Sequence, residues 1–312
     1  MLIREKCIHT LPNKMSMKKK QTLIFASHTC LLAVLLLSCK PITTFDFPNL
    51  ADPSALKAAI ASQVAGSSSD TILKIDYETQ EENGGLSLVN PTNAPADDAA
   101  SITSPGREGN YAIAHKVVLG DPGYFSNESY RSESDAINMP EALFFPGDKR
   151  RYEFSVKLVD WELWNPANTP YGDNIFQLKV SGGDPVPIRF LTKRHAIVAR
   201  YGATGQATIV PDFRPHINSW MDFRIDVLWS DKGDGWMKVY TRLPGQTDYT
   251  LRFENLHATT FTGVQLDKGQ KGYIKWGVYR EAGKDAAGHI ITSDNIITRI
   301  AQHDDIRIIR LP

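Results

Sequence analysis

The sequence contains little cysteine and no excess of charge. Its three cysteines, Cys7, Cys30 and Cys39, all lie near the N-terminus, so the chain beyond Cys39 can form no internal disulfide and depends on a hydrophobic core for stability. The formal net charge is +0. Residues 1–38 hold six Lys and Arg against one acidic residue, which leaves the rest of the chain with five more acids than bases. This balance does not favour nucleic acid as a partner.

Several common signatures are also missing. The sequence shows no internal repeat, no glycine-rich phosphate loop and no paired set of Cys and His with metal-ligand spacing. No sustained helical period of apolar residues follows residue 70, which argues against a helical domain. The histidines of this part are scattered, and a surface or hydrogen-bonded role is the commoner one for each. They are His115, His195, His216, His257, His289 and His303.

The N-terminus has the pattern of an export signal. Lys18–Lys20 is basic, residues 22–37 are mostly apolar, and Leu36-Leu-Ser-Cys39 has the form of a bacterial lipobox. The apolar run is short for a membrane span, and its flanks are those of a signal. We therefore predict a signal peptide over residues 1–38 and a lipid anchor at Cys39. The protein would be a bacterial membrane-anchored lipoprotein in the periplasm or at the cell surface.

Residues 39–70 are predicted to form a tether. Prolines interrupt the first part, residues 55–65 have the composition of one short helix, and Gly66–Asp70 has the composition of a linker. A spacer that lifts a domain off a membrane and an ordinary disordered N-terminus both fit this pattern.

From Thr71 onward the sequence predicts β-strands, because short segments rich in β-branched and aromatic residues are separated by Gly, Pro, Asn and Asp. Asp222–Trp229 alternates most clearly, and a glycine-containing turn joins it to residues 236–240, as in a β-hairpin. Residues 71–312 should therefore form one all-β domain, a two-sheet sandwich. The predicted strands are 72–77, 111–119, 152–159, 174–180, 188–191, 196–201, 223–229, 236–241, 274–279, 295–300 and 306–309. The polar stretch 79–110 is predicted to be a long loop or an irregular crossing, and it could border a groove.

Residues 273–281 form the most informative of these segments. Alternation puts Tyr273, Lys275 and Tyr279 on one face of the strand and apolar residues on the other. A solvated outer face is the commoner meaning of such a pattern. Gln177 and Lys179, which share a face of the segment 174–180, would however fit beside it on one sheet.

Arg131 and Glu133 add a cation and a carboxylate to this set, although they would equally form an ordinary ion pair along one strand. A groove lined by these residues has a charge suited to an anionic ligand and aromatics suited to sugar rings. β-Elimination in a uronic-acid polymer needs this combination, because the proton at C5 leaves beside a carboxylate that must be neutralised. Gln177 with Arg131 or Lys179 would neutralise it. A tyrosine beside Lys275 would take the proton and protonate the leaving oxygen.

The motif Tyr273-Ile-Lys-Trp-Gly-Val-Tyr279-Arg280 resembles the C-terminal signature of the jelly-roll polysaccharide lyases, especially the heparin-lyase and glucuronan-lyase-like group, and is similar to a motif of alginate lyases. The resemblance extends over residues 110–312. It includes Arg131-Ser-Glu133, Gln177-Leu-Lys179, the strand Trp220–Trp229 and His303-Asp-Asp-Ile-Arg307. It implies a β-jelly roll with a concave catalytic sheet.

The resemblance also implies roles. Tyr279 would be the catalytic acid and base, with Tyr273 as its rival, Lys275 its electrostatic partner, and Arg131 and Gln177 subsite residues and neutralisers. The predicted substrate-binding residues are Lys179, Glu133, Tyr273, Arg280, His195 and Trp161. For Trp161, packing in the core or a loop remains an alternative to a sugar-stacking platform.

The sequence departs from the family at Lys179, where related lyases usually have Gln-x-His. Lysine can neutralise a carboxylate but is a poor base near neutral pH. The alternatives are catalysis by Tyr279 alone, recruitment of His195 or His115, or a chain that only binds carbohydrate. A glycoside hydrolase ranks last, because no obvious set of paired carboxylates is present.

We expect an anionic polysaccharide as the partner, a membrane contact through Cys39, and a monomer. No cofactor is expected. Some lyases of this type hold calcium, and Asp231, Asp234, Asp304 and Asp305 are acidic enough to suggest a site, although acids in turns usually only form the turn.

Overall fold

The computed structural model describes residues 70–163, 172–182, 186–261, 269–280, 283–284, 290–291 and 297–312. The predicted signal peptide, Cys39 and the predicted tether up to residue 69 lie outside these residues. Within the described ranges, no helix is long and apolar enough to cross a membrane.

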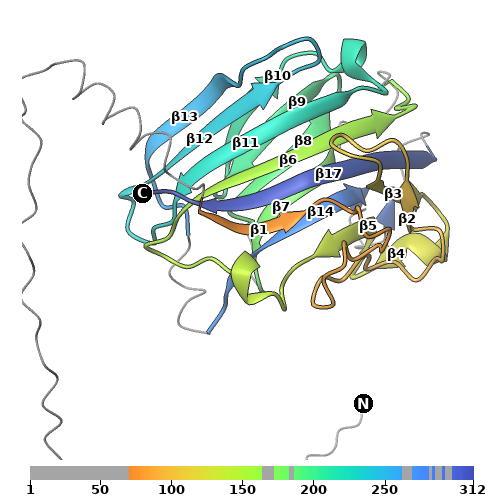
Figure 1. Cartoon of the computed structure of the whole chain (residues 1–312), viewed down its shortest axis with the longest axis horizontal. Coiled ribbons are helices and arrows are strands. Elements are labelled where there is room, and N and C mark those ends of the chain that lie inside the picture. The colour runs from red at the N-terminus through yellow and green to blue at the C-terminus, as the bar shows by residue number, and fades with distance from the viewer. Residues whose placement is uncertain are drawn as a thin grey trace, which may run out of the picture. The chain divides into compact units, whose positions relative to one another are not determined.

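Two antiparallel sheets pack face to face as a β-sandwich (Figure 1). The larger sheet has the strand order β13-β12-β11-β6-β17-β3-β2, with β1 paired to β17. Its strands are β1 (Thr71–Ile75), β2 (Ala100–Thr103), β3 (Ala112–Val118), β6 (Lys149–Val159), β11 (Trp220–Leu228), β12 (Gly235–Arg242), β13 (Thr250–Ala258) and β17 (Thr298–Arg310).

The smaller sheet has the order β10-β9-β8-β7-β14-β5-β4. Its strands are β4 (Phe125–Ser126), β5 (Ser129–Asp135), β7 (Asp173–Val180), β8 (Ile188–Lys193), β9 (Ala196–Tyr201), β10 (Gly205–Val210) and β14 (Gly272–Arg280). A short pair, β15 (Gly283–Lys284) and β16 (Ile290–Ile291), and three 3-10 helices, η1 (Pro122–Tyr124), η2 (Pro140–Ala142) and η3 (Arg214–His216), complete the described elements. The predicted jelly-roll sandwich is confirmed.

Aromatic residues join the two sheets. Phe154 of β6 stacks on Phe176 of β7 with ring centroids 3.8 Å apart, and Phe223 of β11 lies 5.2 Å from Phe154. All three are almost fully buried, and burying each such side chain contributes roughly 1.5–3 kcal/mol. Alternation along each strand turns every second residue toward the other sheet, and these three positions are apolar because they lie in the core between the sheets.

The predicted hairpin is present, since Leu228 of β11 pairs with Trp236 of β12. Apart from β5, where only Arg131 and Glu133 were placed along a strand, the strands β2, β4, β10, β13, β15 and β16 were not predicted; β2, β4, β10 and β13 are the end strands of the two large sheets. Edge strands bury less apolar surface, so their sequences alternate weakly. The two last predicted strands are one strand, β17, which is interrupted by a bulge at Asp305, where φ is +50°. Residues 295 and 296 of the predicted strand 295–300 lie outside the residues that the structure describes.

β14 lies inside the smaller sheet between β7 and β5. Gly277 makes this position workable. Its φ is +135°, and a Cβ there would lie 2.3 Å from the carbonyl oxygen of Ser132 on β5. A side chain would therefore force β5 and β14 apart. The pairing of β14 with β7 is irregular at the same place, between Trp276 and Tyr279.

Candidate active site

Three neighbouring strands bring most of the predicted residues to the outward face of the smaller sheet. Lys275 on β14 lies opposite Gln177 on β7, and Tyr279 lies opposite Arg131 on β5. Directly opposed residues share one face of a sheet. The intervening residues of β14, Ile274, Trp276 and Val278, belong to the core. The alternation read from the sequence therefore matches the sheet.

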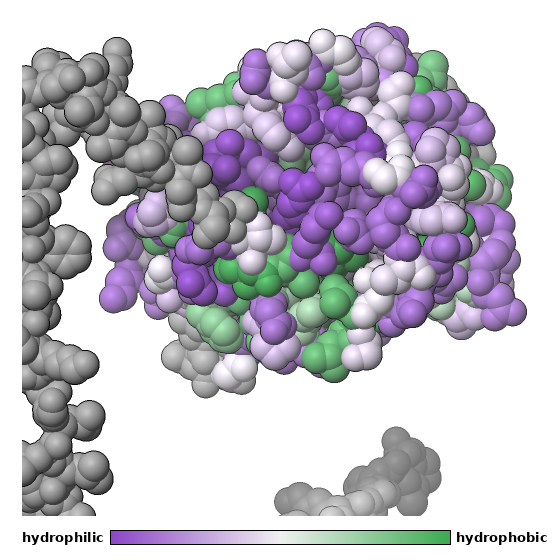
Figure 2. Space-filling model, viewed as in Figure 1, coloured by the Kyte–Doolittle hydropathy of each residue, from purple (hydrophilic) through white to green (hydrophobic). Residues whose placement is uncertain are grey.

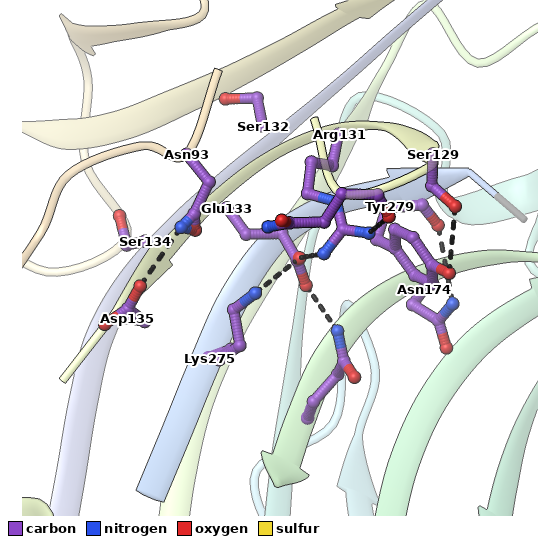
Figure 3. Close-up of polar contacts among 12 residues, drawn as sticks. Asn93, Ser129, Arg131, Ser132, Glu133, Ser134, Asp135, Asn174, Lys275 and Tyr279 are labelled. Atoms are coloured by element: carbon purple, nitrogen blue, oxygen red, sulfur yellow. Dashed lines mark hydrogen bonds and ion pairs between the residues drawn. The ribbon is translucent and has the colours of Figure 1, made fainter. Parts of the chain in front are cut away.

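Glu133 of β5 is the centre of the polar contacts (Figure 3). Lys275 Nζ donates to Glu133 Oε2 at 2.7 Å, and Gln177 Nε2 donates to Glu133 Oε1. Arg131 Nη1 lies 3.9 Å from Glu133 Oε2. All four residues are buried, so they form the floor of the site and not its rim. The carboxylate of Asp135 lies opposite Lys275 on the same face, so two cations and two carboxylates meet here.

Tyr279 lies at one end of this cluster and is partly exposed. Its hydroxyl accepts a hydrogen bond from Ser129 Oγ at 3.2 Å, and the guanidinium of Arg131 lies 4.5 Å from the centroid of its ring. Asn174 Nδ2 donates to the backbone carbonyl of Tyr279 at 3.4 Å. Figure 3 shows Ser129, Arg131 and Asn174 around this tyrosine. A phenol, a cation and an amide are thus gathered at one point of the sheet.

Tyr273, the rival phenol, lies at the other end of β14 opposite Lys179. It is only 7% exposed. Burial raises the pKa of Tyr273, and the nearby carboxylates of Asp135 and Glu133 raise it further. Tyr273 is therefore poorly suited to accept a proton.

Lys179 is on the same face as Tyr279 but is not close to it. Lys179 pairs with Tyr273, six residues before Tyr279, and a strand rises about 3.4 Å per residue. The two backbones are therefore about 20 Å apart. The structure places Asn174, and not Lys179, in the position across from Tyr279.

The loop over residues 79–110 reaches the other side of the cluster. Asn90 and Asn93 donate from Nδ2 to Asp135 Oδ2 at 3.3 and 3.1 Å, and Asp135 lies opposite Lys275. Thr92 also contacts Ser132 of β5. This part of the loop therefore borders the site at β5.

Arg280 and Trp161 belong to a different cluster. Arg280 Nε donates to Asp173 Oδ1 at 2.9 Å, and Arg299 Nε donates to Asp173 Oδ2 at 3.2 Å. The guanidinium of Arg299 lies 4.4 Å from the centroid of the Trp161 ring. Arg280 and Trp161 are each 3% exposed. For Trp161 the structure agrees with the packing alternative.

The two histidines considered as substitutes for the missing imidazole are not beside Tyr279. His195 lies in the turn between β8 and β9, beyond β7 in the sheet order. His115 of β3 is fully buried between the sheets, 2.9 Å from Ser134 Oγ, and its ring meets that of His303 edge to face at 5.6 Å. Burial lowers the pKa of His115 to about 4 and that of His303 to about 3.

Within the described ranges, no group of three or more His, Cys, Asp or Glu could hold a metal ion. Three of the four acids considered for calcium, Asp234, Asp304 and Asp305, have other contacts. Asp304 Oδ2 accepts from the backbone N–H groups of Arg107 and Glu108, Asp234 accepts from Ser230, and Asp305 pairs with Arg307.

Sequence reasoning missed several residues of this face. Asn174 was not predicted as a site residue, because the irregular pairing of β7 interrupts the period of two on which the prediction relied. Ser129 and Asp135 lie in the segment that holds Arg131 and Glu133, and extending the alternation by one residue pair in each direction would have found them.

The structure is thus a jelly-roll β-sandwich whose smaller sheet carries a polar, tyrosine-containing outward face. The chain belongs to the polysaccharide lyase family, because the family model described as Polysaccharide lyase matches residues 74–307. No curated protein matches the sequence.

Several solved structures are similar to this chain, one of them with a TM-score above 0.5. The endo-β-1,4-glucuronan lyase of the fungus Trichoderma reesei is 16% identical in sequence, with a TM-score of 0.51. The match covers 72% of this chain and 92% of the lyase. The PL-14 alginate lyase of Aplysia kurodai is 11% identical with a TM-score of 0.49, covering 77% and 99%. The alginate lyase of Klebsiella pneumoniae is 12% identical with a TM-score of 0.45, covering 68% and 84%. At these identities the likeness concerns the fold alone.

Proposed function

We propose that the protein cleaves a uronic-acid-containing polysaccharide by β-elimination, with Tyr279 as the acid and base. The observation that carries this proposal is the arrangement of Tyr279 beside Arg131 and Asn174, next to the buried cluster in which Glu133 holds Lys275. Such a site attracts a carboxylate and offers a phenol where a proton must move.

In the proposed reaction, the carboxylate of the sugar binds near Arg131, where Gln177 and Asn174 supply amide groups. Neutralising this carboxylate stabilises the negative charge that develops when the C5 proton leaves. Tyr279 takes that proton, the C–H electron pair forms the C4=C5 double bond, and the C4–O bond breaks. The proton passes to the leaving oxygen, and Ser129 holds the phenolic oxygen in place by its hydrogen bond. The product carries an unsaturated sugar at its new non-reducing end.

Glu133 has a positioning role in this proposal. Its two carboxylate oxygens accept from Lys275 and Gln177, which fixes both side chains in a buried place where an unpaired charge would be costly. Lys275 then acts through its charge, at a distance from the reacting atoms. Lys179 would contact a sugar residue further along the polymer.

A second candidate is a protein that binds an acidic glycan without cleaving it. It is favoured by lysine in place of the histidine of Gln-x-His, and by the placement of His115 and His195 away from Tyr279. Both candidates use the same sheet face and differ in the chemistry at Tyr279.

The test is to incubate the purified full chain with alginate, glucuronan and glycosaminoglycans and to follow the ultraviolet absorbance of a conjugated unsaturated uronide. A rise with one polymer is the expected result. Binding of a polymer without any rise or shortening would instead establish the second candidate.

We also propose that Cys39 carries a lipid that anchors the protein to a bacterial membrane. The support is the lipobox Leu36-Leu-Ser-Cys39. Cys39→Ala should move the protein from the membrane fraction to the soluble fraction. A variant that stays with the membrane as wild type does would exclude the anchor.

A further inference from the structure

A pocket of about 400 Å³ opens on the outward face of the larger sheet, where β13 and β12 form one edge of that sheet (Figure 1). Strand register sets Lys149 of β6, Leu228 of β11 and Trp236 of β12 in one row across this face. Lys238 and Tyr240 follow Trp236 on the same side of β12, because side chains alternate along a strand. The other residues that line the pocket are Asp226, Leu256, Leu311 and Pro312.

Trp236 differs from the other aromatic residues on this face of the sheet. Each of the others has a cation over its ring, at 4.9, 4.6 and 5.0 Å from the centroid, namely Lys157 over Trp220, Arg224 over Tyr240 and Arg242 over Tyr249. Across the part of the chain that the structure describes, no cation and no aromatic ring covers Trp236. Trp236 is partly exposed. A large flat side chain that is left uncovered in a hollow is suited to stack on a ligand.

The walls of the pocket supply both apolar surface and hydrogen-bond donors. Leu256 of β13 is 49% exposed and adds apolar surface beside Trp236. Lys149 Nζ donates to the backbone oxygen of Pro312 at 2.8 Å. Lys238 Nζ lies 3.7 Å from the Glu254 carboxylate, in an exposed pair of the kind that contributes little to stability. An ammonium has three N–H donors, so both lysines keep donors for a ligand in addition to these partners.

The acid that lines the pocket does not repel an anion strongly. Asp226 accepts from Nε of Arg151 at 2.8 Å and from Nη2 of Arg224, which lies 2.6 Å away. Two guanidinium groups therefore compensate its charge before any ligand binds. The pocket thus combines an uncovered indole, apolar walls and ammonium donors.

A sugar ring of an acidic polysaccharide fits this combination. The C–H face of the ring stacks on an indole, and its hydroxyl and carboxylate oxygens accept from ammonium groups. A quaternary ammonium ligand would also stack on Trp236, but Lys149 and Lys238 would repel it. A lipid surface is a poorer fit, because it requires apolar side chains that protrude, whereas these line a hollow.

We propose that Trp236, Lys149 and Lys238 form a second carbohydrate-binding site, on the opposite sheet from Tyr279, that binds an acidic polysaccharide without cleaving it. Packed sheets lie about 10 Å apart and their outward faces point in opposite directions, so one short oligosaccharide cannot occupy both sites. The second site would hold the protein on a polymer while the candidate active site binds another stretch. This inference takes its choice of ligand from the proposed function, but it does not depend on the chemistry at Tyr279.

The experiment counts bound oligosaccharides. The full chain with Tyr279→Phe, which prevents cleavage, is titrated with tetrasaccharides of alginate, glucuronan and hyaluronan in a calorimeter. We expect two molecules of one of these tetrasaccharides to bind per protein. Adding Trp236→Ala should remove one of them, since losing the stacked ring lowers the affinity of that site at least about tenfold. Equal stoichiometry and affinity with and without Trp236→Ala would overturn the inference.

The matched control is Trp220→Ala, which removes a partly exposed tryptophan from the same sheet face, where Lys157 covers the ring. It should leave the stoichiometry unchanged. An equal loss in Trp220→Ala would show that the effect is not specific to the pocket, and would also overturn the inference. Lys149→Ala/Lys238→Ala is the second variant if Trp236→Ala has a lower midpoint of thermal unfolding. It keeps the indole and should lower the affinity of the second site, more at low ionic strength than at high.

A lipid surface is the alternative occupant, and the test includes it. The full chain with Cys39→Ala, which cannot carry a lipid, is mixed with phosphatidylglycerol vesicles. Vesicle binding that Trp236→Ala abolishes, together with unchanged binding of all tetrasaccharides, would assign the pocket to a membrane and overturn the inference.

The outcomes separate this inference from the proposed function. If wild type cleaves no polymer but Trp236→Ala removes one bound tetrasaccharide, the second site is supported and the lyase is not. If wild type cleaves a polymer and Trp236→Ala changes no binding, the lyase remains and the second site is removed. Cleavage of a tetrasaccharide should proceed with equal kcat/KM in wild type and Trp236→Ala, because the pocket lies on the other sheet.

Discussion

The outward faces of the two sheets contain similar residues in different arrangements. On the larger sheet, Asp222 accepts hydrogen bonds from Nε and Nη2 of Arg107, both at 2.9 Å, and from Nε of Arg242 at 2.8 Å. Asp226 is held in the same way by Arg151 and Arg224. Figure 2, in the view of Figure 1, shows this face with hydrophilic residues gathered across its middle.

On the smaller sheet, Glu133 also lies between two cations, but Arg131 is 3.9 Å away and its guanidinium is stacked over Tyr279. A count of charges therefore does not distinguish the two faces. Geometry does, because the forked arginines of the larger sheet commit their donors to an aspartate, whereas Arg131 donates from Nη2 to the backbone carbonyl of Asn127 and lies over the ring of Tyr279. The comparison teaches that the two faces differ in where the cations are directed and not in the number of charges.

The largest expected effect is that of Tyr279→Phe. Removing the hydroxyl should lower kcat about 10²- to 10⁴-fold, the range for loss of an acid or base, with a small change in KM. The matched control is Tyr240→Phe on the larger sheet, where Arg224 lies 4.6 Å from the ring centroid much as Arg131 does over Tyr279. Steady-state kinetics on the cleaved polymer check both variants. Equal losses, or none in Tyr279→Phe, would remove Tyr279 from the chemistry.

The two central carboxylates provide the second test. Glu133→Gln and Asp222→Asn each leave a buried or partly buried cation without its partner, and both should lower the free energy of unfolding by about 3 kcal/mol. Only Glu133→Gln should also lower kcat of the folded protein, about tenfold or more, because it releases Lys275 and Gln177. Denaturant unfolding and kinetics at a temperature where both variants are folded separate the two effects. The role of Glu133 is refuted if Asp222→Asn loses as much activity.

The third test concerns His115 and His303, which are buried between the two sheets. The unfolded histidine pKa is 6.5, but burial lowers the pKa of His115 to about 4 and that of His303 to about 3. The unfolded chain therefore binds more protons than the folded one below pH 6.5, so stability should fall as the pH decreases from 6.5 toward 4. Each imidazole contributes at most about 1.4 kcal/mol per pH unit.

Asp304 partly opposes this loss. Burial raises its pKa from 3.8 to about 6, so the folded chain holds an extra proton between these values and gains stability as the pH falls through them. Urea unfolding at a series of pH values measures the net slope, and His303→Gln should flatten it. A free energy of unfolding that is constant between pH 6.5 and 4.5 would contradict the assignment.

The smallest expected effect is that of Lys179→Ala. Because Lys179 lies about 20 Å from Tyr279, its loss should raise KM for a long polymer a few-fold and leave kcat unchanged. Asn174→Ala should instead lower kcat about 10²-fold, as loss of one donor to a developing negative charge does. Kinetics of the two variants on one polymer make this check. A larger fall in kcat for Lys179→Ala than for Asn174→Ala would reverse their assigned positions.

Much of the fold could be predicted from the sequence, because alternation is a local property. The strand Asp222–Trp229, its hairpin partner and the polar face of residues 273–279 all follow from the period of two. The edge strands β2, β10 and β13 could not be predicted in this way, since they bury too little apolar surface to leave a clear pattern.

The candidate site was only partly predictable for a related reason. The sequence indicated that Tyr279, Lys275, Gln177 and Arg131 share a sheet face, since each lies on the polar side of its own strand. It could not indicate that an irregular pairing at Gly277 brings Asn174 across from Tyr279, or that Lys179 falls opposite Tyr273.

By itself, the sequence determined that this is an all-β protein and which side chains of each strand turn outward, because both depend on neighbours within a few residues. Only the tertiary structure decided that Glu133 joins Lys275 to Gln177 and that Arg131 lies over Tyr279. These contacts depend on strand order and register, which are fixed by packing between segments far apart in the chain.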